Sequence, residues 1–125
     1  MFSITKEVRF SAAHHLVLPY NSPCGRLHGH EWVVYITIEG SRLNDSGMLL
    51  DFAFISKAIK DRYDHKLLND VIPQPTAELI ALDIFQVVSD LILKESYIGL
   101  TLPLPICEKV RVFESVGSEA VYENV

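Results

Sequence analysis

Residues 28–39 read HGHEWVVYITIE, and this stretch decides the fold. Successive side chains of a β-strand point to opposite faces, so alternate residues share a face. One such face is apolar after two histidines, which predicts a half-buried strand whose first inward side chains are imidazoles. That face carries His28, His30, Trp32, Val34, Ile36 and Ile38.

The residues before this strand predict a second one, from Phe2 to His15. Its even positions are mostly apolar and its odd positions mostly polar. His14 therefore continues the inward face, and His15 continues the outward face. Residues 16–27 predict a loop between the two strands, because they contain the turn-forming residues Pro19, Asn21, Pro23 and Gly25.

The rest of the chain predicts a short strand, two helices and a final strand pair. The short strand is expected at Met48–Asp51, with Asp51 also as the N-cap of a helix that buries Phe52, Ile55, Ile59 and Tyr63. A second helix is expected from Pro75 and Thr76 to before Gly99, followed by a Pro-rich connection at 101–105 and strands at 106–114 and 120–123. This order indicates an α+β fold, whose open sheet edges favour oligomerisation.

The composition narrows the classes of function. The chain has 125 residues, which suit one domain spanning 1–125, and 49% of them are hydrophobic. A formal net charge of −5 and the absence of a Lys/Arg cluster argue against a nucleic-acid surface. No apolar run approaches the roughly 18 residues of a membrane span, and two distant cysteines suggest no disulfide framework. We therefore expect a cytoplasmic protein without a nucleic-acid or membrane partner.

Three histidines form a candidate metal site. His28 and His30 are two residues apart on one strand, so their side chains project to the same face and can chelate one ion. His14 is the expected third ligand, because His15 lies on the opposite face. Three protein ligands with an open fourth position are the pattern of catalytic zinc. From the residues alone, the alternative is a set of hydrogen-bonded histidines at a strand end.

Cys24 lies four residues before His28 on the predicted loop. Three interpretations remain open at this point: a fourth ligand that closes a structural zinc site, a free thiol beside an open metal, or a buried inert cysteine. A cation nearby favours the thiolate form of a cysteine, which suits proton transfer. Cys107 lies on a predicted strand with no histidine near it, and we expect it to be inert.

Six pieces of the sequence occur in the order of a known enzyme family. They are Phe10-Ser-Ala-Ala-His14, Cys24-Gly-Arg-Leu-His28-Gly-His30, Leu50-Asp-Phe52, Asp64-His65 with Leu68-Asn-Asp70, Pro75-Thr-Ala-Glu78 and Val112-Phe-Glu-Ser115. In these pieces the chain resembles the 6-pyruvoyl-tetrahydropterin synthase family, and within it the bacterial 6-carboxy-tetrahydropterin synthases of queuosine biosynthesis. Gln74 and Ala77 depart from the family pattern, which often has Asn before the Pro-Thr pair and a hydroxyl residue after it.

The resemblance implies a fold and an assembly. The fold is the tunnelling type, a four-stranded antiparallel sheet with two helices on one face. Three subunits would join their sheets into a barrel, and two trimers would stack as a homohexamer with sites between subunits.

The resemblance also implies a role for each site residue. Zn²⁺ would be held by His14, His28 and His30, and a pterin would be anchored by Glu114. The catalytic residues would be Cys24 and His65, which move protons, and Asp64, which sets the tautomer of His65 and supports its protonated form. A hydrogen bond between Asp64 and His65 requires the first helix to end by about Tyr63. The remaining substrate-binding candidates are Thr76 in the Pro-Thr turn and the cations Arg26 and Lys66.

The implied reaction converts 7,8-dihydroneopterin triphosphate to 6-carboxy-5,6,7,8-tetrahydropterin with loss of triphosphate and acetaldehyde. The alternative within the family is the 6-pyruvoyl-tetrahydropterin product, but the three residues between Cys24 and His28 favour the carboxy branch. Two alternatives come from other classes. One is a non-catalytic zinc-binding assembly module with Cys24 as fourth ligand, and the other is a Cys-His hydrolase, for which no oxyanion motif is evident near Cys24.

Overall fold

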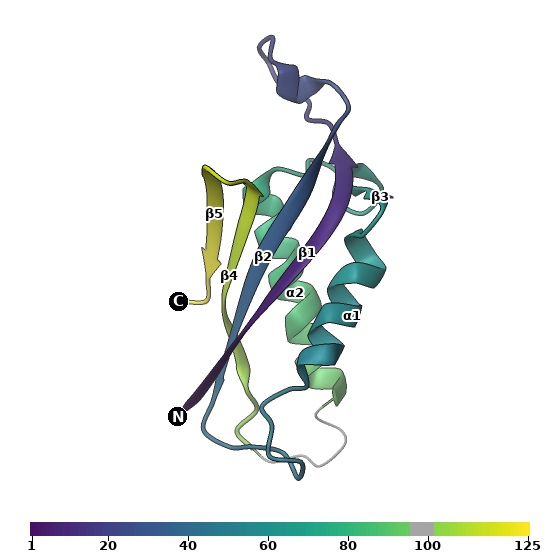
Figure 1. Cartoon of the computed structure of the whole chain (residues 1–125). Coiled ribbons are helices and arrows are strands. Elements are labelled where there is room, and N and C mark those ends of the chain that lie inside the picture. Colours follow the sequence, from purple (N-terminus) through teal and green to yellow (C-terminus); the bar gives the residue numbers. More distant parts are fainter. Residues whose placement is uncertain (96–101) are drawn as a thin grey trace.

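A computed structural model describes residues 1–95 and 102–125 of the chain. Five strands form one sheet in the order β3-β1-β2-β4-β5, and two helices cover one of its faces (Figure 1). The α+β class is therefore confirmed. The elements are β1 (Phe2–His14), β2 (His28–Gly40), α1 (Phe52–Tyr63), β3 (Lys66–Leu67), α2 (Ala77–Glu95), β4 (Ile106–Ser115) and β5 (Ser118–Glu123), with 3₁₀ turns η1 (Pro23–Gly25) and η2 (Leu68–Asp70).

The antiparallel register of β1 and β2 organises the sheet. It pairs Phe2 with Gly40 at one end and His14 with His28 at the other. The inward faces are buried as the alternation predicted from Val8 of β1 and from Trp32 of β2 onward, but Phe2 at the start of β1 is 50% exposed. The same register that builds the core therefore brings two histidines side by side at the end of the sheet.

Local signals set the helix starts. Asp51 caps α1 through its side chain, which accepts a hydrogen bond from the Ala53 amide, as predicted. The Thr76 hydroxyl accepts a bond from the Leu79 amide and caps α2 in the same way. Position 99, before which α2 was expected to end, lies outside the described residues, and so does Thr101 of the Pro-rich connection.

The predicted buried stripe of α1 is wrong at one position. Ile55, Ile59 and Tyr63 are fully buried, but Phe52 is 48% exposed. Phe52 is the first residue of the helix, so α1 packs against the sheet only from its second turn.

The predicted strand at Met48–Asp51 is also wrong. Its backbone is used locally, because the Met48 carbonyl accepts from the Asn44 amide and the Met48 amide donates to the Asn44 side chain. Such an Asx turn satisfies groups that a sheet would otherwise pair. The additional strand is instead β3, which pairs in parallel with Ala12 and Ala13 of β1. Among the described residues the sheet thus has five strands rather than the four expected. The sequence did not predict β3 because two residues are too few to give a periodic signal.

A bulge alters the predicted inward face of β4. The pairing of β2 with β4 shifts between Thr37 and Ile38, so that Thr37 faces Lys109 and Ile38 faces Cys107. Glu108 is the extra residue, and Cys107 takes the inward position that the even pattern assigned to Ile106. Cys107 is 2% exposed and Ile106 is 49% exposed. Burial raises the pKa of the Cys107 thiol to about 12, which suits the expected inert role.

Neither described helix combines the length and the apolar content that a membrane span requires.

Candidate metal centre

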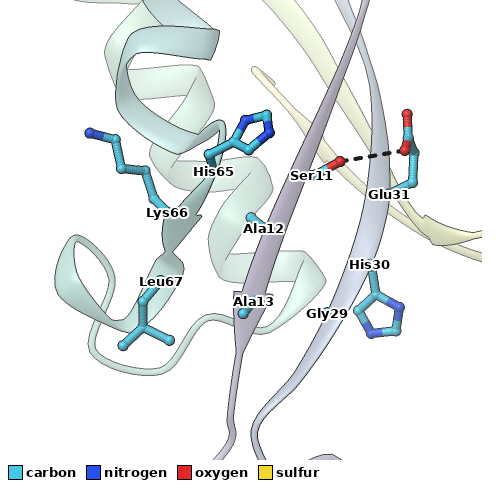
Figure 2. Close-up of a pocket in the computed structure, with 9 residues that line it drawn as sticks. All are labelled: Ser11, Ala12, Ala13, Gly29, His30, Glu31, His65, Lys66 and Leu67. Carbon is cyan, nitrogen blue, oxygen red and sulfur yellow. Dashed lines mark hydrogen bonds between the residues drawn. The ribbon is translucent and has the colours of Figure 1, made fainter.

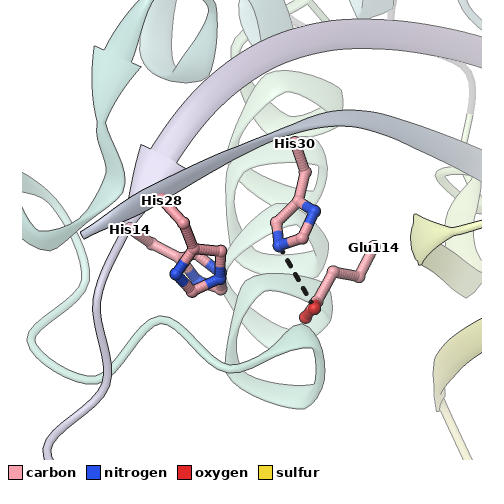
Figure 3. Close-up of side chains that lie close together, drawn as sticks. All are labelled: His14, His28, His30 and Glu114. Atoms are coloured by element: carbon pink, nitrogen blue, oxygen red, sulfur yellow. Dashed lines mark hydrogen bonds and ion pairs between the residues drawn. The ribbon is translucent and has the colours of Figure 1, made fainter. Parts of the chain in front are cut away.

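Four side chains from three strands converge at the end of the sheet (Figure 3). His14 comes from β1, His28 and His30 from β2, and Glu114 from β4. One donor atom of each lies within 4.8 Å of the other three. His14 is buried and the others are half-buried, so the group is only partly shielded from solvent.

Backbone carbonyls fix the ring orientation of two histidines. His14 Nδ1 lies 2.8 Å from the Pro75 carbonyl, and His28 Nδ1 lies 2.6 Å from the Arg26 carbonyl. A carbonyl only accepts, so each Nδ1 carries the proton and each Nε2 presents a lone pair. Those Nε2 atoms lie 3.0 Å apart. Tetrahedral zinc with bonds of about 2 Å spaces its ligand atoms about 3.3 Å apart, so this arrangement suits a shared cation.

The third ring supplies a nitrogen that has no hydrogen-bond partner. His30 Nε2 is buried and makes no hydrogen bond with any residue that the structure describes. The Glu114 carboxylate is 3.2 Å away, at ion-pair distance but without hydrogen-bond geometry. A buried polar atom left unpaired is costly, and a metal ion removes that cost. Three imidazole nitrogens and one carboxylate oxygen therefore have the composition and geometry to hold a metal ion.

The electrostatic surroundings of the buried His14 ring also favour metal binding. Burial lowers the pKa of His14, and the charges of His28 and His30 lower it further, although the Pro75 carbonyl opposes them. The neutral form of the ring is thus favoured, which is the form that binds metal ions.

The alternation of strand positions correctly predicted that His14 and His15 lie in different places. His15 is not part of the donor group, and its backbone amide and carbonyl bind the side chain of Asn69 instead.

Cys24 lies outside the donor group, in the η1 turn. That turn belongs to the loop that extends past the end of the sheet (Figure 1). Ser22 Oγ caps the turn by accepting from the Cys24 amide, and the Cys24 carbonyl accepts from the Leu16 amide at 3.0 Å. The thiol is half-buried. The side chain that lies closest to the three histidines in this group is therefore Glu114 and not Cys24.

The predicted Asp64–His65 pair forms immediately after α1 ends at Tyr63. Asp64 Oδ2 lies 3.1 Å from His65 Nδ1, and Asp64 Oδ1 accepts from the Ser11 amide at 3.0 Å. The bond from Ser11 lowers the pKa of the Asp64 carboxyl. His65 adopts a φ of 57°, and its own amide donates to the Ser11 carbonyl. The turn after the helix is thus bonded to the edge of β1 through the Asp64 side chain and the His65 amide, and the His65 ring is held by Asp64.

His65 lines an open pocket of about 600 Å³ (Figure 2). Ser11 and Glu31 on this pocket lie at odd positions of their strands, on the sheet face opposite His14 and His28. Lys66 is exposed beside it, whereas Arg26 is exposed on the loop before β2. The pocket residues are Ser11, Ala12, Ala13, Gly29, His30, Glu31, His65, Lys66 and Leu67.

Some contributors to the site were not visible in the sequence. Pro75 and Arg26 act through backbone carbonyls, and Ser11 through its amide and carbonyl. Any residue except proline offers both groups, so residue type gives no signal for them. Only the tertiary positions of these groups identify them.

Comparison with known proteins identifies one family and several relatives named as pterin synthases. Residues 3–125 match the family model described as 6-pyruvoyl tetrahydropterin synthase. The chain is 34% identical over 129 aligned residues to the 6-carboxy-5,6,7,8-tetrahydropterin synthase of Bacillus subtilis, covering 97% of this chain and 84% of that protein. It is 37% identical over 95 residues to the Synechocystis enzyme of the same name, covering 68% and 73% of the two chains.

A solved structure supports the fold. The 6-pyruvoyl tetrahydropterin synthase of Caenorhabditis elegans superposes with a TM-score of 0.70 at 22% identity, covering 99% of this chain and 96% of that one. This likeness confirms the predicted tunnelling-type fold. The match to the family model over nearly the whole chain, together with the B. subtilis relative, shows that the chain belongs to the 6-pyruvoyl tetrahydropterin synthase family.

Proposed function

We propose that this protein is a zinc-dependent lyase that converts 7,8-dihydroneopterin triphosphate to 6-carboxy-5,6,7,8-tetrahydropterin, releasing triphosphate and acetaldehyde. One observation carries the proposal: three imidazole nitrogens converge beside a carboxylate in a chain that belongs to the 6-pyruvoyl tetrahydropterin synthase family. The relatives named 6-carboxy-tetrahydropterin synthase favour this product over the pyruvoyl alternative. We place the activity in the cytoplasm and in queuosine biosynthesis.

His14, His28 and His30 would hold Zn²⁺ through their Nε2 atoms. The zinc would supply Lewis-acid polarisation of oxygens on the substrate side chain. The carbonyls of Pro75 and Arg26 keep two of the rings in the tautomer that ligation needs.

Glu114 serves in the proposal as the pterin anchor. A carboxylate can accept two parallel hydrogen bonds from the guanidine-like edge of a pterin. Its distance of 3.2 Å from His30 Nε2 would place the bound pterin against the metal ligands. Thr76, whose hydroxyl already caps α2, would contact the substrate from the first turn of that helix, and Arg26 is the proposed partner of the triphosphate.

Cys24 and His65 would move protons on and off the carbons of the substrate side chain. Asp64 accepts from His65 Nδ1, which leaves Nε2 of that ring directed outward and able to exchange a proton. Because the Ser11 amide also binds Asp64, the carboxylate remains charged and stabilises the protonated ring.

The site of the proposal lies between subunits of a homohexamer. Within one chain, His65 lines a pocket together with Ser11 and Glu31, which lie on the sheet face opposite His14, and of the three histidine ligands only His30 is among the described lining residues. Joining of sheets into a trimeric barrel would bring the outer face of one chain next to the end of another. The edge strands are β3 and β5, and β3 pairs only with Ala12 and Ala13 of β1. The outer edge of β1 before Ser11 and the edge of β5 are therefore the surfaces proposed for such pairing.

The test is turnover by the purified, zinc-loaded protein. It is incubated with 7,8-dihydroneopterin triphosphate, the pterin product is identified by mass, and released acetaldehyde is assayed. We expect the 6-carboxy product with one acetaldehyde per turnover. A pyruvoyl product without acetaldehyde would assign the other branch, and no conversion with the metal fully loaded would refute catalysis and favour a zinc-binding assembly module.

A further inference from the structure

The outer edge of β1 continues beyond the end of the strand through side-chain amides. Asn69 Oδ1 accepts from the His15 amide at 3.0 Å, and Asn69 Nδ2 donates to the His15 carbonyl at 2.9 Å. Gln74 repeats the arrangement one strand period later, accepting from the Val17 amide at 3.0 Å and donating to the Val17 carbonyl at 2.9 Å. Each amide thus copies the donor and acceptor of a peptide group.

These two bonded pairs complete a regular series along one edge. Ser11 binds Asp64 and His65, and Ala13 pairs with Leu67 of β3. His15 and Val17 then follow at the same spacing of two residues, which is the spacing at which backbone groups of an extended chain point to the same side. Residues 15–17 are therefore held as an extension of β1, although they belong to no strand.

This extension is hydrogen-bonded to the turn that carries Cys24. Leu16 is the residue between the two bonded positions, and its amide donates to the Cys24 carbonyl at 3.0 Å. The other backbone bonds of the η1 turn are local, from Gly25 to Ser22 and from Arg26 to Pro23. Loss of the extended conformation at Leu16 would release the tie between the strand and the turn that carries the thiol.

Gln74 also couples this tie to the metal ligands. The next residue is Pro75, whose carbonyl fixes the ring of His14. Of these two consecutive residues, Gln74 holds the segment that is bonded to the Cys24 carbonyl, and Pro75 fixes the orientation of His14.

We propose that Gln74, assisted by Asn69, is a positioning residue that fixes Cys24 relative to the metal ligands. The catalytic part of this inference rests on the proposed function, whereas the structural part does not. A primary amide is required because it combines an acceptor and a donor in one planar group, which neither a carboxylate nor an apolar side chain does. This role would explain why an amide side chain stands at position 74, where the chain departs from the family pattern.

The experiment compares Gln74→Leu with Gln86→Leu in the full-length, zinc-loaded protein. Gln86 is exposed on α2, so the control makes the same chemical change away from the site. Gln74→Glu is a second variant that keeps the size of the side chain and removes its donor. Three properties are measured: hydrogen exchange at the Leu16 and Val17 amides, the rate of Cys24 alkylation by iodoacetamide, and kcat, KM and zinc content.

We expect Gln74→Leu to exchange these two amides at least about tenfold faster and to alkylate Cys24 several times faster than Gln86→Leu. In Gln74→Glu the carboxylate can still accept from the Val17 amide but repels the Val17 carbonyl, so the same changes should be smaller. Misplacement of a reacting group by about 1 Å costs up to about a hundredfold in rate, so kcat should fall about tenfold to a hundredfold with zinc content unchanged. Unchanged exchange at Leu16 and Val17 would overturn the inference, and so would faster exchange with unchanged kcat. If the parent protein shows no turnover, the proposed function fails. Hydrogen exchange and alkylation still test whether Gln74 positions Cys24.

Discussion

The Nε2 atoms of His14 and His28 face each other at 3.0 Å, each with a lone pair, because both Nδ1 atoms are bound to backbone carbonyls. Two lone pairs at this distance repel unless a metal ion or a proton lies between them. A metal ion bound at this place in the folded chain relieves the repulsion and adds to the free energy of unfolding.

Removal of one ligand should abolish stoichiometric zinc binding, whereas a change at the adjacent histidine should not. We expect His14→Ala to lose bound zinc and His15→Ala to retain about one ion per subunit, because only the first ring lies in the donor group. Metal content of the purified variants measures this. Equal zinc content in the two variants would contradict the assignment of His14.

Truncation of Cys24 should separate catalysis from metal binding. Since Cys24 is not among the four converging side chains, Cys24→Ala should keep its zinc and its thermal stability while losing turnover. Zinc content, thermal unfolding and product formation are compared with those of Cys107→Ala. That control removes a buried thiol and should lower stability without a specific effect on turnover. Joint loss of zinc and fold in Cys24→Ala would favour the closed structural site.

The Asp64 carboxylate should make stability depend on pH in the acid range. The Ser11 amide lowers its pKa in the folded state, so its contribution is fully present above the unfolded value of about 3.9 and is lost as the pH falls through the folded value. Asp64→Asn should therefore be less stable than the parent at pH 7, and the difference should shrink below about pH 4. Thermal unfolding across this range is compared with that of Asp45→Asn, in an exposed turn. The same pH dependence in both variants would count against the Ser11 bond.

The contact between α1 and α2 depends on Asp83. Its carboxylate accepts from Arg62 at 2.8 and 3.1 Å and from the hydroxyl of the fully buried Tyr63. Burial, with the Asp83 carboxylate, raises the pKa of Tyr63, so the hydroxyl stays a donor. Asp83→Ala leaves that donor unsatisfied and should lower the free energy of unfolding by about 1–3 kcal/mol.

The control for this prediction is Asp61→Ala, which breaks the exposed pair with Lys57 on α1. Exposed pairs contribute little, so the change should stay within about 0.5 kcal/mol. Denaturant unfolding measures both variants. Similar losses in the two would show that the Asp83 contact is no stronger than a surface ion pair.

The sequence alone determined the features that arise from local periodicity. Alternation along β1 and β2 predicted both strands and their inward faces, and the same parity separated His14 from His15. The Asp51 cap and the buried residues Ile55 and Ile59 were likewise predicted from neighbouring positions. These predictions succeed because the side-chain directions of strands and helices repeat at fixed intervals of the chain.

The tertiary structure determined the features that depend on hydrogen bonds between backbone groups far apart in the sequence. The two-residue strand β3 gives no periodic signal, and the bulge that turns Cys107 inward arises from pairing with Ile38. The carbonyl of Pro75 orients His14, and the side chain of Gln74 extends the edge of β1, over separations of 61 and 57 residues. Backbone donors and acceptors are the same in nearly every residue, so their partners are set by three-dimensional position and not by residue type.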